Sequence, residues 1–142
     1  MVGALIAIVG GVIFRRVEAD QQRRHWFRDQ LRLAAEQFLA DAAKHLALSR
    51  DRMQGDIHDT SAAHKQLFGA LAIDIARLQL VAEKPVFESA DKVATKLVAA
   101  LEAANNVTGA HDTEHLKAAL EGSLDAFGDT REFAELVKRH LN

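Results

Sequence analysis

The chain opens with an uninterrupted apolar run and then repeats apolar residues at helical spacing almost to its end. Residues 2–14 contain no charged side chain, and apolar positions then recur every three or four residues over residues 17–53, 61–83, 85–105 and 112–141. That spacing gathers apolar side chains on one face of an α-helix. We therefore predict an all-α fold, an antiparallel up-down four-helix bundle whose long first helix extends into the N-terminal run.

Each predicted helix has a stripe of residues that we expect to face the core. On the first helix the stripe consists of Phe27, Leu31, Ala34, Phe38, Ala42, His45 and Ser49. On the second it consists of His64, Leu67, Phe68, Leu71, Ile75, Leu78 and Ala82. On the third it consists of Val86, Ala90, Val93, Leu97, Ala100, Leu101 and Ala104. On the fourth it begins with Leu116, Leu120, Leu124 and Phe127.

Short segments with turn-forming residues separate these helices. A loop over residues 55–60 follows the first helix, and Pro85 suits the first turn of the third, where its missing N–H is not needed. Asp112 or Thr113 can cap the fourth helix. We expect this last helix to continue through residues 128–130 with a local kink.

The composition excludes several kinds of chemistry. The 142 residues include one Pro and no Cys, and Ala and Leu dominate the apolar positions. A chain without Cys has no disulfides, no thiol catalysis and no Cys-ligated zinc or iron–sulfur site.

The N-terminal run and the arginines after it are typical of a membrane anchor. Residues 15–32 hold six Arg against three carboxylates, although the net charge of the whole chain is −2. Positive charge beside an apolar helix is usually kept on the cytoplasmic side of a membrane. We predict an anchor over residues 1–16 and a bundle over residues 17–142. The chain would then be a single-pass inner-membrane protein with its N-terminus outside and its bundle in the cytoplasm.

Two sets of residues carry the predicted anchor. The side chains expected in lipid are Leu5, Ile6, Ile8, Val9, Val12, Ile13 and Phe14. The side chains expected to contact headgroups are Arg15, Arg16, Arg23, Arg24 and Arg28. A helix over residues 2–14 is about 20 Å long, whereas the hydrocarbon core is about 30 Å thick. The prediction therefore relies on snorkelling arginine stems and local thinning of the bilayer.

Small residues follow one face of the same run. Gly3, Ala7 and Gly11 recur every four residues, a spacing that lets two membrane helices approach closely. We predict this face as the contact between anchors. The competing interpretation is that Gly and Ala are simply common in membrane helices.

A five-residue motif raises the question of metal chemistry. Residues 111–115 match the pattern H-x-x-E-H, in which two His bind zinc and a Glu acts as base. Such a site would use His111, Glu114 and His115 and would need a third ligand and both His on one helix. Because the helix is expected to start at the capping residues, His111 should lie outside it. We predict no catalytic site, no metal and no cofactor.

Other histidines lie where a core or loop role is expected. His45 and His64 are on the core stripes of the first two helices, where each is expected to be a satisfied core histidine, and a pH-sensitive pair is the alternative. Asp56, His58 and Asp59 in the first loop, with His64, form a weak candidate metal site. Solvated loop groups and a helix cap are the favoured interpretation of these residues.

The order of these features resembles that of small uncharacterised proteins of actinobacteria and their phages. In these proteins a short N-terminal membrane helix leads into an Arg-rich helix and then an Ala-rich bundle. The resemblance implies a membrane-tethered helical bundle and brings no catalytic residues. The residues that carry it are Arg15-Arg16, residues 23–28, residues 36–40, residues 78–82 and Pro85-Val86.

These observations favour a tethered interaction module over an enzyme. We predict contact with the lipid bilayer and with a protein partner or a second copy, and neither nucleic acid nor a small-molecule substrate. Trp26 and Phe27 lie among arginines and could stack on nucleobases, but we expect them to begin the bundle core. The main alternative is a soluble helical homo-oligomer that buries residues 2–14 between subunits. A metal-dependent enzyme is the remote third interpretation.

Overall fold

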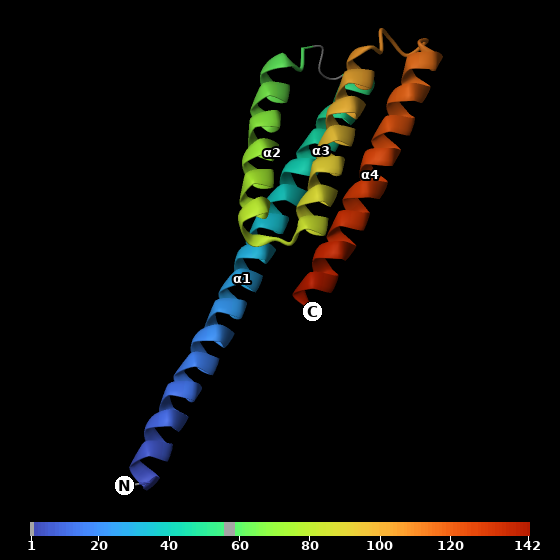
Figure 1. Cartoon of the computed structure of the whole chain (residues 1–142). Helices are drawn as coiled ribbons and strands as arrows, with labels where there is room; N and C mark the ends of the chain where they lie inside the picture. Colours follow the sequence, from blue (N-terminus) through green and yellow to red (C-terminus); the bar gives the residue numbers. More distant parts are fainter. Residues whose placement is uncertain (1, 56–58) are drawn as a thin grey trace. The chain divides into compact units, whose positions relative to one another are not determined.

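A computed structural model describes residues 2–55 and 59–142, with the side chains of residues 2–11, 13 and 14 outside the description. Over these residues the chain forms four α-helices and no strand, which confirms the predicted all-α class with four helices (Figure 1). The helices are α1 (Val2–Met53), α2 (Ser61–Val81), α3 (Lys84–Asn105) and α4 (Thr113–Leu141).

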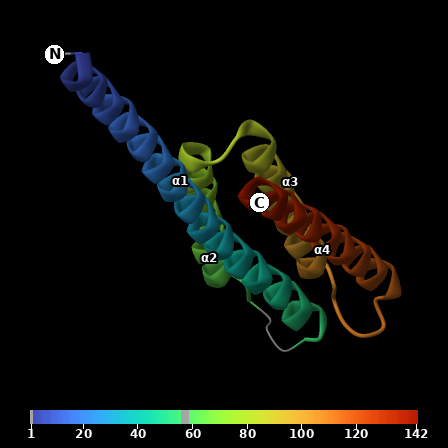
Figure 2. The ribbon, with the colours of Figure 1, turned by 90° about the horizontal axis from the view of Figure 1, so that it is seen from below.

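The chain divides into two compact units, Met1–Gln30 and Leu31–Asn142. This division lies further along the chain than the predicted boundary after residue 16. The second unit contains the C-terminal part of α1 and all of α2, α3 and α4. Within it, consecutive helices run in opposite directions and are joined by short connections, which is an up-down arrangement (Figures 1 and 2).

Local chemistry explains where the helices begin and end. Pro85 occupies the first turn of α3, and Gly55, with φ of 79°, follows the end of α1 in a left-handed conformation that glycine adopts without strain. The Asp112 side chain caps α4 by accepting a hydrogen bond from the His115 N–H. The helix α4 then continues unbroken through residues 128–130, where the Thr130 hydroxyl donates to the Ala126 carbonyl at 2.7 Å.

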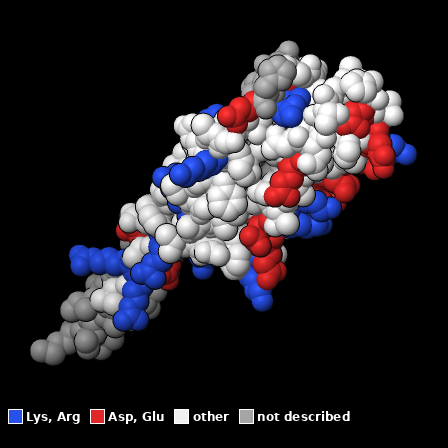
Figure 3. Space-filling view, turned by 90° about the horizontal axis from the view of Figure 1, so that it is seen from above, with Lys and Arg blue, Asp and Glu red and all other residues white. Residues whose placement is uncertain are grey.

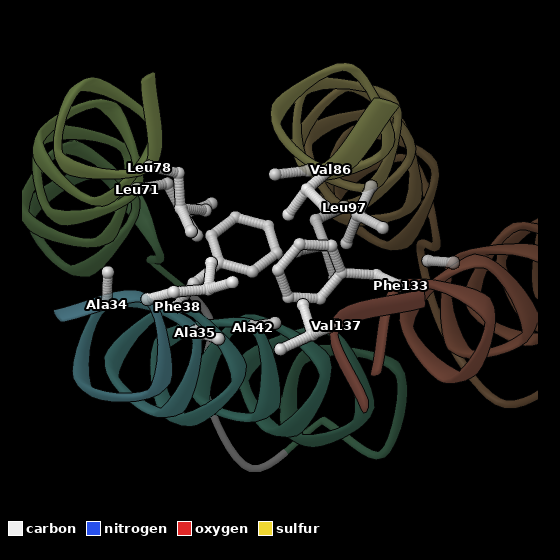
Figure 4. Close-up of a cluster of buried hydrophobic side chains, with 14 residues drawn as sticks. Ala34, Ala35, Phe38, Ala42, Leu71, Leu78, Val86, Leu97, Phe133 and Val137 are labelled. Carbon is white, nitrogen blue, oxygen red and sulfur yellow. The ribbon is translucent and has the colours of Figure 1, made fainter. Parts of the chain in front are cut away.

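The core of the second unit follows the predicted stripes of α1 and α3. Every residue predicted to face the core from α3 is buried, and the same holds for the α1 stripe from Leu31 to Ser49. Phe38 of α1 and Phe133 of α4 meet edge to face at its centre, with ring centroids 4.9 Å apart (Figure 4).

The prediction that Trp26 and Phe27 begin the core is wrong. Trp26 is 54% exposed and Phe27 is 41% exposed. The two rings instead contact one another edge to face, with centroids 5.0 Å apart. Helical periodicity continues from Phe27 into the buried stripe, but Phe27 belongs to the unit Met1–Gln30 and the core belongs to Leu31–Asn142.

The predicted core stripe of α4 is wrong at three of its positions, whereas Leu116 is half-buried and packs against a buried cluster. Leu120, Leu124 and Phe127 are exposed at 54%, 69% and 52%, and a different stripe is buried in their place. The buried residues of α4 are Ala119, Ala126, Phe133 and Val137. On this side of α4 the residues are small, and Gly122 faces Ala100 of α3, whose Cα would be in ordinary contact, at 3.5 Å, with a Cβ added to Gly122. Small residues let α4 approach α3, and the leucines then lie on another side of the helix.

The structure gives no support to the predicted membrane anchor. Among the described residues, no helix has a stretch that is both long enough and apolar enough to cross a membrane. The backbone of residues 2–14 is helical, but of the predicted lipid-facing side chains only Val12 is described, and it is 50% exposed. The other lipid-facing side chains and the face of Gly3, Ala7 and Gly11 lie outside the described residues.

Candidate functional site

Polar side chains interrupt the core where α1 meets α2. Asp41, His45 and Ser49 follow one face of α1 at intervals of four residues, and all three are buried. Asp74 of α2 is buried as well, and His64 of the same helix is half-buried. We call Asp41, His45, Ser49, His64 and Asp74 the polar seam. Buried polar groups are costly unless they are paired, so the seam is the part of the core that packing alone does not explain.

Two carboxyl groups face each other in the seam. Burial, together with the neighbouring Asp41 carboxyl, raises the pKa of Asp74 to about 7. The hydrogen bond from the protonated Asp74 lowers the pKa of Asp41 below its usual value. Below about pH 7 Asp74 therefore keeps its proton and donates it to the ionised Asp41 carboxyl.

Cations and an amide surround this carboxyl pair. The Gln37 Nε2 donates to Asp41 Oδ2 at 3.2 Å, and the Lys44 Nζ lies 3.6 Å from Asp41 Oδ1. On α2 the Arg77 guanidinium lies 4.0 Å from Asp74 Oδ1. Both cationic side chains are more than half exposed, so water screens them and the shared proton remains the main partner of the two carboxyls.

The two histidines of the seam lie one beside the other. The rings of His45 and His64 are edge to face with centroids 6.1 Å apart. Burial, with the nearby His64, lowers the pKa of His45 to about 4, so this imidazole is neutral at pH 7. Within the described residues neither ring nitrogen of His45 has a hydrogen-bond partner, and the Ser49 hydroxyl has none either. The expectation of a satisfied core histidine is therefore wrong for His45.

Sequence reasoning found part of the seam and missed the rest. The positions of His45, Ser49 and His64 on the predicted core stripes follow from their spacing. Asp41 was missed, although it lies one turn before His45 on the same face. The signal that could have found it is this interval of four residues from a predicted core position.

The H-x-x-E-H motif does not form a metal site. The helix α4 begins at Thr113, so His111 precedes it and does not share a helix with His115. His115 Nδ1 lies 2.8 Å from Asp112 Oδ2, and hydrogen bonds from Thr108 lower the pKa of Asp112 to about 2. No group of three potential metal ligands occurs in the part of the chain that the structure describes.

The other candidate loop site is only partly described. Asp59 Oδ1 accepts a hydrogen bond from the Ser61 N–H at 2.9 Å at the start of α2, and this bond lowers the pKa of Asp59. That is the expected geometry of a helix-start residue. Asp56 and His58 lie outside the described residues.

The predicted headgroup-contacting arginines lie on the exposed surface of α1. All five are exposed, and basic side chains gather along this part of the helix (Figure 3). They are Arg15, Arg16, Arg23, Arg24 and Arg28. With Trp26 and Phe27 between them, this segment presents cations and aromatic rings together, a combination that is common where a helix meets a membrane surface.

Two exposed apolar features complete the candidate surfaces of the second unit. The first is the outward face of α4, formed by Leu120, Leu124 and Phe127, which we call the α4 stripe. The second is a groove of about 450 Å³ between α2 and α3. Its lining is apolar except for Asp91 and Thr95 and includes Phe68, Leu71, Ala72, Ile75, Ala94 and Val98.

Comparisons with known proteins add no family to this picture. No protein-family model matches the chain, and no curated protein or solved structure matches it. The resemblance to actinobacterial and phage proteins therefore stays a prediction.

Proposed function

We propose that this chain is a membrane-tethered helical bundle that acts by binding protein, with its N-terminal helix at the inner membrane and its bundle in the cytoplasm. The observation that carries the binding role is the α4 stripe, in which three large apolar side chains are at least half exposed on one helix. Contiguous apolar surface on a folded domain typically marks an interaction site. The function is that of an interaction or scaffold module, without catalysis.

The tether is supported by the composition and exposure of the first unit. An apolar run leads directly into exposed arginines on the same continuous helix. Each basic side chain near an anionic leaflet contributes about 1 kcal/mol, so five of them would compensate for a short apolar helix. In this proposal residues 2–14 enter the bilayer and the arginines bind headgroups.

A second candidate is a soluble homo-oligomer. It is favoured by one observation, that no described helix is long and apolar enough to cross a membrane. In that case residues 2–14 would be buried between subunits and the arginines would face water.

Alkaline carbonate extraction of membranes from expressing cells separates these candidates. The full chain should remain in the pellet, and a variant lacking residues 2–16 should be soluble and still helical. A matched variant, with Arg15, Arg16, Arg23, Arg24 and Arg28 replaced by Gln, keeps the apolar run and removes the charge. It should be extracted more readily than the full chain. A full chain that is already soluble contradicts the tether, and sizing the particle would then test the oligomer.

A further inference from the structure

The apolar groove between α2 and α3 continues onto the outward side of α2. Phe68 and Ala72 line the groove and are themselves exposed. Next to them, exposed residues without a polar side chain recur at intervals of four, three and four residues, and these are Gly69, Ile73, Ala76 and Leu80. We call all of these residues together the outer α2 face. A helix that is apolar on its outward side as well as on its core side is typically covered by something other than water.

The charges that border this face are all positive. Along α2, which the structure describes in full, no exposed residue is acidic, because its single carboxylate, Asp74, is buried. The exposed charged residues of the helix are Lys65 and Arg77. The Arg77 guanidinium lies 4.0 Å from Asp74 Oδ1, but its side chain remains 61% exposed. The outer α2 face therefore offers apolar side chains and cations to whatever covers it.

The other helices of the second unit differ from α2 in this respect. Each of them carries exposed carboxylates, among them Glu36 on α1, Asp91 and Glu102 on α3, and Glu121, Glu132 and Glu135 on α4. An anionic surface would repel these carboxylates and attract the cations of α2. The outer α2 face is therefore the side of the second unit that an anionic surface would accept.

We propose that the outer α2 face lies against an anionic lipid surface. An apolar side bordered by Lys and Arg is the pattern of a helix that lies in the plane of a membrane interface. Two such faces packed on each other would supply no carboxylate to the cations of either, which disfavours a second copy as the occupant. The inference rests on the proposed tether and adds a second membrane contact, made by the bundle itself.

The tether would bring the bundle within reach of lipid. The predicted headgroup-contacting arginines occupy residues 15–28, about 20 Å of helix, so this segment runs along the membrane surface when all of them bind headgroups. The second unit begins at Leu31, directly after this segment. Its connection to the arginines is therefore too short to hold the bundle away from the headgroups.

Fluorescence quenching by lipids that carry a nitroxide on their acyl chains tests this contact. The chain has no cysteine of its own, so a single fluorophore can be attached to a chosen position of the full chain. Leu80→Cys places it on the outer α2 face, where the leucine is 80% exposed and its replacement should not disturb the core. Leu124→Cys of α4 is the matched control, since this leucine is 69% exposed. Val12→Cys, in the N-terminal helix, reports the tether separately.

The labelled chains are reconstituted into vesicles of phosphatidylcholine with phosphatidylglycerol. We expect several-fold more quenching at Leu80→Cys than at Leu124→Cys, because only the outer α2 face reaches the acyl chains. In vesicles of phosphatidylcholine alone this excess should fall, because the attraction of Lys65 and Arg77 to anionic headgroups is removed. An excess that is the same in both kinds of vesicle would overturn the assignment to anionic lipid.

Failure of the α2 contact and failure of the tether give different results. Quenching at Val12→Cys, with equally low quenching at Leu80→Cys and Leu124→Cys, would keep the tether and overturn the α2 contact. A label at Leu80→Cys that is shielded from water but not quenched would show that protein covers the outer α2 face, which also overturns the proposal. An unquenched label at Val12→Cys would overturn the tether itself.

Discussion

The two sides of the bundle are held together by different chemistry. Where α3 meets α4, the fully buried groups are apolar, and the ion pairs Lys92–Asp129 and Lys96–Asp125 lie beside them. Where α1 meets α2, the buried groups include two carboxyls and an imidazole. The stabilisation from apolar contacts does not depend on pH, whereas the stabilisation from the polar seam depends on which of its groups are protonated. One repeating apolar pattern therefore produces both an interface with an apolar interior and an interface with a titratable interior.

The largest effect is expected from a substitution in the apolar contact between α3 and α4. Leu97→Ala removes a fully buried side chain of α3 and should lower the free energy of unfolding by about 2–5 kcal/mol. Leu124→Ala is the matched control, since this leucine is 69% exposed and its truncation should change stability by less than about 0.5 kcal/mol. Urea unfolding of the purified chain measures both. Equal losses in the two variants would mean that α4 presents the other face to the core.

This contrast between leucines also shows how far the sequence predicts the fold. The third helix has one apolar stripe with alanines within it, so its buried face could be predicted completely. The fourth helix has two candidate stripes, one of leucines and one of alanines with Phe133 and Val137. Periodicity ranks the leucines first because they are larger, but the face of α4 that packs against α3 carries alanines and Gly122 with Phe133 and Val137. Only the partner helix decides between the two.

An intermediate effect comes from the unpaired imidazole of the polar seam. His45→Leu keeps a similar volume and removes two buried nitrogens that have no partner among the described residues, so it should raise the free energy of unfolding by about 1 kcal/mol. His140→Leu is the control, since His140 Nδ1 lies 2.9 Å from the Leu136 carbonyl oxygen, and this variant should not be stabilised. Thermal unfolding near pH 7 compares them. Destabilisation by His45→Leu would show that the imidazole has a partner after all.

The smallest expected effect is a change in how the free energy of unfolding depends on pH. The pKa of Asp74 is about 7 in the folded chain and 3.8 in the unfolded chain. Between these pH values only the folded chain holds the proton. The stabilisation that this proton gives the fold is therefore lost as pH rises through about 7. His45 acts in the opposite direction: its folded pKa is about 4 against 6.5 when unfolded, so stability is lost as pH falls from 6.5 to 4. The two slopes offset each other over most of this range.

Asp74→Asn separates the two slopes. An Asn amide can donate to the Asp41 carboxylate at any pH, so the variant should keep the His45 slope and lose the decline toward pH 7. Denaturation curves from pH 4 to 8 measure this, with the exposed Asp91→Asn of α3 as the control that should follow the wild type. If the free energy of unfolding depended on pH in the same way in the wild type and in Asp74→Asn, the Asp74 proton would not stabilise the fold.

The candidate site was predicted less completely than the fold. Each residue of the polar seam lies at a helical interval from a predicted core position, so the sequence could place several of them inside. Their pairing could not be predicted, because Asp41 and Asp74 are brought together by the packing of two helices and not by any motif. The exposed arginines of α1 differ in this respect, because their clustering can be predicted from the sequence without knowing how the helices pack.

A carbon-13 NMR titration of the aspartate side-chain carboxyls, assigned with Asp74→Asn, tests most directly the claim that the α1–α2 side is held by a shared buried proton. We expect Asp74 to titrate near pH 7 and Asp41 to titrate below 3.8, with the Asp41 signal also shifting when Asp74 loses its proton. Two carboxyls that titrate independently near pH 4 would contradict it.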